Sequence, residues 1–427
     1  MKFRSVFKSR EVQNAGWLIG GKVAQMVLSL FVGLLSARYL GPSNYGLISY
    51  GNALIALFMS LCTLGINSVI VKELLDNPQS QGEALGTAIF LRVLSSFLSA
   101  LMAISVSLIL DYGQWETVIV VAMCSVSLVF HAFDTISYWF QARYQSKILA
   151  LITFAAYVAT SIYKIALLIL QKSVFWFAFA SSVDYIVLAA LLLWAYRKNG
   201  GTPFRFSLTK GRKILSKSYH YILSGMMVAI YGQTDKLMLK QLLSESEVGY
   251  YTIATTLCGM WTFILSAVID SMYPTLVRAY QQDKALFAKR NRQLYAIVFY
   301  LSVCASLGFT VLGNWIVKLL YGAEYLPAVI PLRVVTWYTA FSYLGVARNA
   351  WMVCNDKQKY IKFMYIPAVF INIALNSLLI PTMGATGAAV ASLVTQIATS
   401  ILLPLCIRDL RPNAKLMLEA ILLKNIH

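Results

Sequence analysis

Long apolar segments recur along the whole chain, and they constrain its fold more than any other feature. A helix needs about 20 apolar residues to cross the hydrocarbon core of a bilayer. Hydrophobic residues make up 59% of the 427 and charged residues only 12%, which is typical of a membrane protein. We therefore predict an all-α polytopic membrane protein with about 12 transmembrane helices. The predicted spans cover residues 14–37, 45–71, 85–110, 117–140, 148–170, 173–196, 218–242, 248–273, 293–320, 327–352, 363–380 and 384–407.

A short basic segment with Lys2, Arg4, Lys8 and Arg10 precedes the first of these spans. The apolar stretch that follows is too long for the core of a cleavable signal peptide, so we interpret it as a membrane span.

The distribution of lysine and arginine predicts the orientation of the chain. Basic residues are enriched in the cytoplasmic loops of membrane proteins. With the N-terminus inside, 26 of the 36 lysines and arginines fall in cytoplasmic segments, and only Arg38 and Lys172 fall in external loops. We therefore expect both termini to be cytoplasmic. The net charge of +19 favours contact with anionic lipid, and its spread over many loops argues against a nucleic-acid partner.

The longest basic segment, 197–217, divides the predicted spans six and six and contains the helix breaker Gly200-Gly-Thr-Pro203. We predict an N-terminal six-helix bundle over 1–196, a cytoplasmic linker over 197–217, a C-terminal six-helix bundle over 218–407 and a cytoplasmic tail over 408–427. A shift of 203 residues aligns the second span of each half. The aligned pairs are Leu40 with Leu243, Ser43 with Ser246, Gly46 with Gly249, Leu54 with Leu257, and Asn67-Ser68 with Asp270-Ser271. Since each half has an even number of spans, the two bundles form a parallel repeat, as in many transporters.

The sequence gives little support to enzyme chemistry. The six cysteines are widely spaced and form no C-x-x-C pair, so neither a disulfide framework nor a metal site is expected. No glycine-rich loop with a following lysine and hydroxyl residue exists to bind a nucleotide phosphate. No loop is long enough for a catalytic domain. We predict a transporter without a cofactor, driven by a proton or sodium gradient or by mass action.

Four segments, in order along the chain, resemble one known family. They are Ala37-Arg-Tyr-Leu-Gly-Pro-Ser-Asn-Tyr-Gly46, Trp139-Phe-Gln-Ala-Arg-Tyr-Gln-Ser-Lys147, Asp235-Lys-Leu-Met-Leu-Lys-Gln-Leu-Leu-Ser-Glu-Ser-Glu-Val-Gly-Tyr-Tyr-Thr-Ile-Ala254, and Asn372-Ile-Ala-Leu-Asn376 with Ile380-Pro-Thr-Met-Gly-Ala-Thr-Gly-Ala-Ala389. Together they resemble the O-antigen (Wzx-type) polysaccharide flippases of the multidrug/oligosaccharidyl-lipid/polysaccharide exporter superfamily. The resemblance implies two six-helix bundles that work by alternating access. It also implies transfer of an undecaprenyl-diphosphate-linked oligosaccharide across the inner membrane, with polysaccharide polymerase machinery as a possible partner.

Charged and amide side chains inside the spans are the candidate site residues, because such groups are expensive in a membrane. Cations could offset the charge of a lipid diphosphate, and amides could match sugar hydroxyls. The candidates for a substrate cavity are Lys22, Arg92, Lys164, Asp235, Lys236, Asn67, Asn372 and Asn376. The candidates for ion coupling are Asp270, Asp184, His131 and Asp134, of which His131 and Asp134 share one helix face.

Each candidate also has a purely structural interpretation. Lys22 and Arg92 lie near enough to the cytoplasmic surface to extend toward it, and Lys164 could extend outward. Asp235 and Lys236 point to different helix faces and could hold the seventh span to its neighbours. The asparagines could tie helices together. At the level of function, a multidrug antiporter of the same superfamily is the alternative, because Asp184 and Asp270 could serve a cationic drug.

Overall fold

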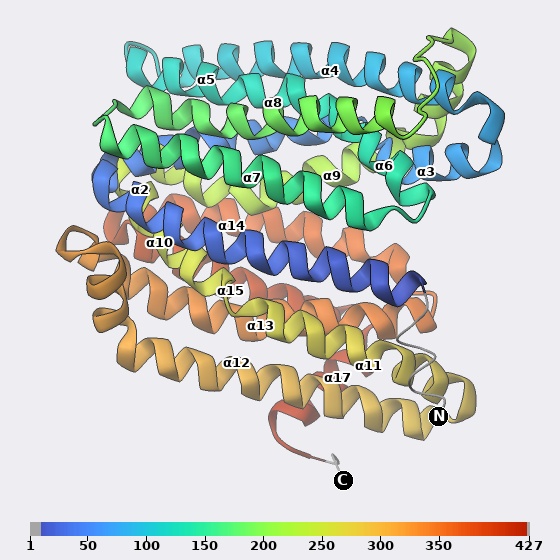
Figure 1. Cartoon of the computed structure of the whole chain (residues 1–427). Coiled ribbons are helices and arrows are strands. Elements are labelled where there is room, and N and C mark those ends of the chain that lie inside the picture. The colour runs from blue at the N-terminus through green and yellow to red at the C-terminus, as the bar shows by residue number, and fades with distance from the viewer. Residues whose placement is uncertain (1–9, 425–427) are drawn as a thin grey trace. The chain divides into compact units, whose positions relative to one another are not determined.

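The structure is a computed structural model and describes residues 10–424, without the side chains of residues 10–19, 21–23, 68 and 224. Throughout the described part of the chain the regular structure is helical (Figure 1). Nine stretches there are long and apolar enough to cross a membrane. They are Ala24–Thr63, Pro78–Leu110, Trp115–Ala142, Ser146–Ile169, Val174–Lys198, Glu245–Gln282, Lys284–Tyr321, Gln358–Met383 and Ala385–Cys406. The predicted all-helical membrane fold is confirmed.

The chain forms two compact units, Met1–Gln233 and Thr234–His427. The boundary between them falls inside helix α9. The helices of the first unit are α2 (Arg10–Thr63), α3 (Asn67–Asp76), η1 (Pro78–Ser80), α4 (Gln81–Leu110), α5 (Trp115–His131), η2 (Ala132–Asp134), α6 (Thr135–Ala142), α7 (Ser146–Ile169), α8 (Val174–Lys198) and α9 (Leu208–Leu242).

Helix α2 contains the first two predicted spans, which are separated at Gly41. This glycine has φ 70° and ψ 173°, a conformation that interrupts the helix, and Pro42 follows it. Positive φ suits glycine, which has no β-carbon, and proline cannot donate the backbone hydrogen bond that a continuous helix needs. If α2 counts as two passes, the nine stretches give ten. The helices α9 and α13 (Val329–Cys354) then bring the described part of the chain to the predicted twelve spans. The polar side chains of α9 and α13 keep them out of the nine apolar stretches.

Helix α4 holds the breaks in its two neighbours within the first unit. Between α2 and α3 the chain turns through Leu64 and Gly65, both at positive φ. Ser95 Oγ donates to the carbonyl oxygen of Leu61 over 2.7 Å at this break. At the second break, η2 interrupts the span formed by α5 and α6, and Arg92 donates to the carbonyl oxygen of His131 over 3.2 Å. Both hydrogen bonds satisfy carbonyls that a continuous helix would have paired.

The second unit contains eight α-helices after the end of α9, among the residues that the structure describes. They are α10 (Glu245–Gly259), α11 (Thr262–Gln282), α12 (Lys284–Tyr321), α13 (Val329–Cys354), α14 (Ile361–Met383), α15 (Ala385–Ile397), α16 (Leu403–Cys406) and α17 (Arg411–Ile421). Short helices η3 (Ala323–Ala328), η4 (Gln358–Tyr360) and the π-helix η5 (Ala398–Leu402) connect some of them.

Arg348 of α13 has a role in the second unit that resembles that of Arg92 in the first. Its side chain is buried, and it donates to the carbonyl oxygen of Thr399 over 3.1 Å, with Ser400 at 3.5 Å. Both acceptors lie in the π-helix η5, where the regular α-helical pattern is interrupted. Each unit therefore places one buried arginine at an irregular turn of a neighbouring helix.

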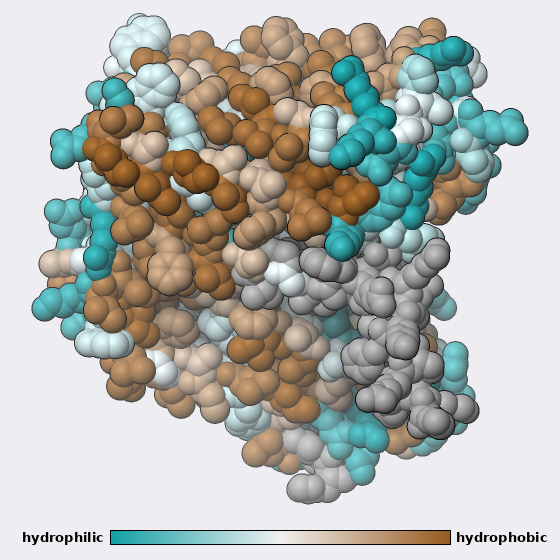
Figure 2. Space-filling view, viewed as in Figure 1, coloured by the Kyte–Doolittle hydropathy of each residue, from teal (hydrophilic) through white to brown (hydrophobic). Residues whose placement is uncertain are grey.

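The surface of each unit matches an apolar surrounding. Large hydrophobic side chains are exposed along the middle of the helices, as on α4 and α12. On the face drawn in Figure 2, hydrophobic residues form the broad middle and hydrophilic residues gather at the two ends of the helices. This pattern is the one expected of helices that pass through a bilayer.

The segment after residue 407, predicted as a cytoplasmic tail, contains helix α17. This helix packs on α12 in the second unit. Arg292 forms an ion pair with Glu419 over 2.8 Å, and the buried Asn413 donates to the hydroxyl of Tyr295 over 2.7 Å. The tail is thus part of the second unit.

Candidate functional site

Asp235 is the centre of a buried polar cluster in the second unit. Its carboxylate accepts four hydrogen bonds, each from a neutral donor. At Oδ1 the donors are Asn376 Nδ2 over 2.7 Å and Asn372 Nδ2 over 3.3 Å. At Oδ2 they are the hydroxyls of Tyr251 and Ser392, each over 2.5 Å. The structure thereby brings together three residues that the sequence analysis predicted independently for a substrate cavity: Asp235, Asn372 and Asn376.

Four helices position this cluster. Asp235 lies on α9, Tyr251 on α10, the two asparagines on α14 and Ser392 on α15. Asn372 and Asn376 are four residues apart, so they share one face of α14, and Asn376 also donates to Asn372 Oδ1 over 3.1 Å. These hydrogen bonds offset the cost of burying a carboxyl group. The cluster therefore holds an acidic side chain inside the second unit, and among the described residues no cation is bonded to it directly.

Lys236, the next residue, is half-buried and interacts electrostatically with Asp235. Consecutive residues of a helix point to different faces, and no hydrogen bond joins these two side chains among the described residues. Lys236 therefore places positive charge beside the cluster and outside its hydrogen-bond network.

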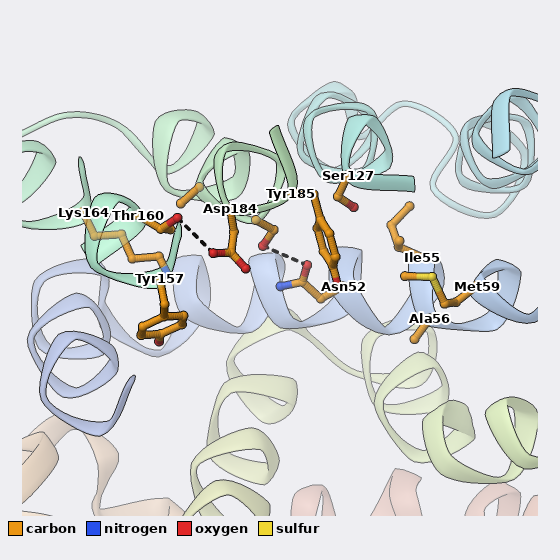
Figure 3. Close-up of a pocket in the computed structure, with 12 residues that line it drawn as sticks. Asn52, Ile55, Ala56, Met59, Ser127, Tyr157, Thr160, Lys164, Asp184 and Tyr185 are labelled. Carbon is orange, nitrogen blue, oxygen red and sulfur yellow. Dashed lines mark hydrogen bonds between the residues drawn. The ribbon is translucent and has the colours of Figure 1, made fainter. Parts of the chain in front are cut away.

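A cavity of about 310 Å³ lies within the first unit, among α2, α5, α7 and α8. Figure 3 shows Lys164, Thr160 and Asp184 at one end of it and Tyr185, Asn52 and Met59 toward the other. Thr160 Oγ1 donates to Asp184 Oδ1 over 3.1 Å, and Ser181 Oγ donates to Asn52 Oδ1 over 3.4 Å. The full lining is Asn52, Ile55, Ala56, Met59, Ser127, Tyr157, Thr160, Lys164, Ala180, Ser181, Asp184 and Tyr185.

Lys164 and Asp184 are the charged groups of this cavity. Both side chains are half-buried, and they lie close enough to interact electrostatically. Lys164 follows Thr160 by four residues, so the two share one face of α7, while Asp184 projects from α8. A cation, a carboxylate, hydroxyls, an amide and two tyrosine rings therefore line one space of about 310 Å³. This mixture can bind a polar ligand by hydrogen bonds and an anionic group by Lys164.

The buried Arg92 and the half-buried His131 and Asp134 form a second polar group in the first unit. The Arg92 guanidinium donates to Thr135 Oγ1 and to His131 Nδ1, each over 2.8 Å. Because arginine can only donate, this histidine nitrogen must be unprotonated. Asp134 lies within electrostatic reach of the same guanidinium. The His131 ring packs edge-on against Tyr185, with 5.0 Å between ring centroids, which links this group to the wall of the cavity.

The remaining candidates lie outside the Asp235 cluster, the cavity and the group around Arg92. Asn67 begins α3, and its Oδ1 atom is buried without a hydrogen-bond partner among the described residues. Asp270 lies on α11 with its side chain exposed. Lys22 lies in α2, but its side chain is outside the part of the chain that the structure describes.

Sequence reasoning did not single out Tyr251 and Ser392 as partners of Asp235, nor Thr160, Tyr157 and Tyr185 as lining residues of the cavity. All five are ordinary hydroxyl residues within apolar helices. The only available signal was that Tyr251 belongs to the same resembling segment as Asp235.

Comparisons with known proteins agree on one family. The family described as "Polysaccharide biosynthesis protein" matches residues 35–330. The capsular polysaccharide biosynthesis protein CapF of Staphylococcus aureus is 19% identical over 397 residues, which cover 90% of this chain and 96% of that protein. The probable flippase AglR of Haloferax volcanii is 27% identical over 194 residues, which cover 43% of this chain and 40% of that protein.

Solved structures share the fold. The lipid II flippase MurJ in an inward closed conformation aligns with a TM-score of 0.72 at 14% identity, over 95% of this chain and 90% of that one. A multidrug resistance MATE family transporter of the MOP superfamily, in an inward-facing conformation, aligns with a TM-score of 0.66 at 14% identity, over 90% of this chain and 95% of that one. The fold predicted from the resembling segments is confirmed.

Proposed function

The chain belongs to the polysaccharide biosynthesis protein family, and on that premise we propose that it transfers an oligosaccharide linked to undecaprenyl diphosphate between the two leaflets of a membrane. The family match and a relative named as a probable flippase support a membrane transporter of the polysaccharide flippase type and not an enzyme, as predicted. The direction of transfer in the proposal is from the cytoplasmic to the periplasmic leaflet of the bacterial inner membrane, by alternating access.

The observation that carries this proposal is the cavity of the first unit. A sugar presents many hydroxyls, and each must keep a hydrogen-bond partner when it leaves water. Asn52, Tyr157 and Ser181 offer such partners in the wall of the cavity, each from a different helix. Lys164 supplies the positive charge that a diphosphate requires in the same space. An apolar cavity without these groups would not suit such a ligand.

The orientation in the proposal follows from the distribution of basic residues. The segments that connect the helices on the predicted cytoplasmic side carry most of the lysine and arginine. Both termini are then cytoplasmic. An accessory contact with polysaccharide polymerase machinery would take place on the periplasmic side, where the lipid-linked unit is delivered.

An ion gradient, of protons or of sodium, is the proposed source of energy. Alternating access can be coupled to an ion when a buried carboxylate binds it in only one of two states. Asp184 faces the cavity and Asp235 is buried in the second unit, so each unit contains a carboxylate that can take this role. Collapse of the gradient that drives transfer, of protons or of sodium, is expected to slow transfer in membrane vesicles. If collapse of neither gradient slows it, mass action is the source of energy.

A multidrug antiporter is the second candidate, and the position of Asp184 favours it. A carboxylate in the cavity wall would attract a cationic drug, whereas Lys164 would repel it. The two side chains therefore distinguish the candidates. In a flippase, loss of Lys164 should abolish transfer of the lipid-linked oligosaccharide. In an antiporter, loss of Lys164 should leave drug resistance intact, and loss of Asp184 should abolish it.

The pool of lipid-linked oligosaccharide tests the proposal. A host that lacks the gene is supplied with the intact chain, Lys164→Ala, or the control Lys172→Ala, which removes an exposed lysine from the loop after the same helix. We expect diphosphate-linked repeat units to accumulate on the inner leaflet without the gene and with Lys164→Ala, together with loss of surface polysaccharide. The intact chain and the control should restore the pool. An unchanged pool with new sensitivity to cationic drugs would instead establish the antiporter.

A further inference from the structure

The linker segment, residues 199–207 between α8 and α9, lies directly on the first turns of α4. The backbone N–H of Arg205 donates to the carbonyl oxygen of Gly82 over 3.2 Å. Two residues later, the backbone N–H of Ser207 donates to Thr87 Oγ1 over 3.0 Å. Near the start of the segment, the carbonyl oxygen of Thr202 accepts a hydrogen bond from the Tyr196 hydroxyl over 2.7 Å. The linker segment is therefore a fixed part of the first unit's surface.

Two glycines allow this close contact. Gly82 and Gly86 are one helical turn apart and face the linker segment. A β-carbon at Gly82 would lie 2.4 Å from the carbonyl oxygen of Pro203, and one at Gly86 would lie 2.6 Å from that of Arg205. Both neighbours are backbone atoms, so no side-chain rotation could relieve the overlap. Any side chain at Gly86 should lift the linker segment from α4.

The linker segment carries exposed aromatic residues that continue the lipid-facing surface of α4. The ring centroid of Phe206 is 4.7 Å from that of Phe90, and the two side chains are 50% and 52% exposed. Leu208, the first residue of α9, is 76% exposed. Beyond Phe90, the exposed hydrophobic residues of α4 include Leu94, Phe97, Leu98 and Leu101. Exposure of so much apolar surface to water is unfavourable, so this surface belongs at the interface of a bilayer.

Two arginines accompany these rings. Arg205 lies between Phe204 and Phe206, and Arg212 lies one turn into α9, and both side chains are exposed. Neither forms an ion pair within residues 10–424. Arg205 is within electrostatic reach of Glu83, but the carboxylate of Glu83 is paired with Lys210 over 2.9 Å. A guanidinium at the level of the headgroups can bind a lipid phosphate through two parallel hydrogen bonds.

We propose that the linker segment, with Phe90 and the first turn of α9, is a docking surface for an anionic phospholipid. The rings of Phe90 and Phe206 enter the interface of the bilayer, and Arg205 and Arg212 bind the headgroup phosphate. Positive charge without an ion-pair partner and continuity with the lipid-facing side of α4 make a membrane lipid the fitting occupant. This inference goes beyond the proposed function, since it requires no particular transported substrate.

A local fluorescent reporter tests the proposal on the full-length protein in detergent. Leu208→Trp adds emission at the exposed start of α9 to that of the nine native tryptophans. The extra quenching of this variant over the parent, on addition of brominated phosphatidylglycerol or brominated phosphatidylcholine, measures binding at the linker segment. We expect a clear preference for phosphatidylglycerol. The pair Arg205→Gln and Arg212→Gln should weaken that binding roughly tenfold or more, since each basic residue near a surface contributes about 1 kcal/mol.

Two further variants separate a defined surface from general attraction. Gly86→Ala keeps every charge but displaces the linker segment, and it should weaken binding of phosphatidylglycerol in the same direction. The pair Lys284→Gln and Lys415→Gln removes the same charge from exposed positions in the second unit and should leave the quenching unchanged. Equal quenching by both lipids, or unaltered binding in the arginine pair or in Gly86→Ala, would overturn the proposal. The lipid-linked oligosaccharide pool is a separate measurement, so failure here would not bear on the proposed function.

Discussion

Asn376 donates a 2.7 Å hydrogen bond to Asp235 across 141 residues of sequence, which joins α14 to α9 in the interior of the second unit. The carboxylate of Asp235 accepts three more hydrogen bonds, so one acidic side chain connects four helices. Such a group stabilises the fold only while all of its partners are present, because a buried donor that loses its acceptor retains the full cost of desolvation.

Replacement of Asp235 by alanine should therefore destabilise the second unit strongly. Four donors would lose their acceptor, and each unsatisfied group costs about 1–3 kcal/mol, less any relaxation of the site. Asn376→Ala should have a smaller effect, because three donors to Asp235 remain. Thermal unfolding in detergent measures both. Asp270→Asn changes an exposed carboxylate and should have little effect, and a stability of Asp235→Ala equal to that of the control would contradict the assignment.

Arg92 should be similarly important for the first unit. Arg92→Met would leave the carbonyl oxygen of His131 without this donor and Asp134 without a nearby positive charge. We expect a loss of about 2–4 kcal/mol of stability, because removal of one member of a buried charged group leaves the others uncompensated. Arg92→Lys keeps the charge but lacks the planar arrangement of donors, so it should recover only part of the loss. Arg197→Met, at an exposed position, is the control in the same thermal measurement, and equal effects of the two methionine variants would argue against the role.

The sequence allows prediction of the membrane spans and of the interruption between the first two, where the structure has Gly41, because both depend on local composition. A run of about 20 apolar residues specifies a span by its length alone, and a glycine followed by proline interrupts a helix wherever it lies. The contacts of Asp235 could not be predicted in the same way. Its amide partners are 137 and 141 residues away, and their distance in space depends on how α9, α14 and α15 pack.

Some local features were also beyond prediction. The break between α2 and α3 contains no proline and uses Leu64 at positive φ, which is an uncommon conformation for a leucine. The linker was predicted from its basic and glycine-proline composition. Its backbone contacts with α4 at Gly82 and Gly86 could not be predicted, because a hydropathy pattern does not reveal them. The charged candidates of the first unit separated into a cavity pair, Lys164 and Asp184, and a buried group around Arg92, and helix position alone does not distinguish these.

Asp409 should make stability depend on pH in the acidic range. Hydrogen bonds from the Tyr360 hydroxyl and from the Lys357 ammonium, the latter over 3.3 Å, lower the pKa of this carboxyl group, which lies after the last membrane-spanning stretch. A lowered pKa in the folded state adds stability that is present above the unfolded pKa, near 3.8, and is lost as the pH falls through the folded value. Asp409→Asn should thus be less stable than the parent at pH 6.

The difference between the two proteins should shrink as the pH falls below about 4, where the carboxyl of the parent is protonated as well. Melting temperatures between pH 6 and 3 measure it. Asp76→Asn removes an exposed carboxylate in the first unit and should run parallel to the parent throughout. A constant difference between Asp409→Asn and the parent over this range would show that the charge of Asp409 is not the cause.

Gly384 should be intolerant of any side chain, and this bears on the cluster around Asp235. It joins α14, which carries Asn372 and Asn376, to α15, which carries Ser392, and it has φ 57°, a region that favours glycine. A β-carbon there would also lie 2.4 Å from Glu247 Oε2. That carboxylate accepts a hydrogen bond from the backbone N–H of Ala385 over 2.6 Å at the start of α15, where an anion is favoured by the helix dipole.

Gly384→Ala therefore combines backbone strain with displacement of Glu247. We expect it to cost at least about 1 kcal/mol from the unfavourable φ alone, and to shift α15 against α14. Gly308→Ala is the matched control, because nothing lies within 4 Å of its added β-carbon and its backbone is helical. It should be neutral or slightly stabilising. If Gly384→Ala melts at the same temperature as Gly308→Ala, the turn between the two helices does not hold Ser392 in register with Asn372 and Asn376.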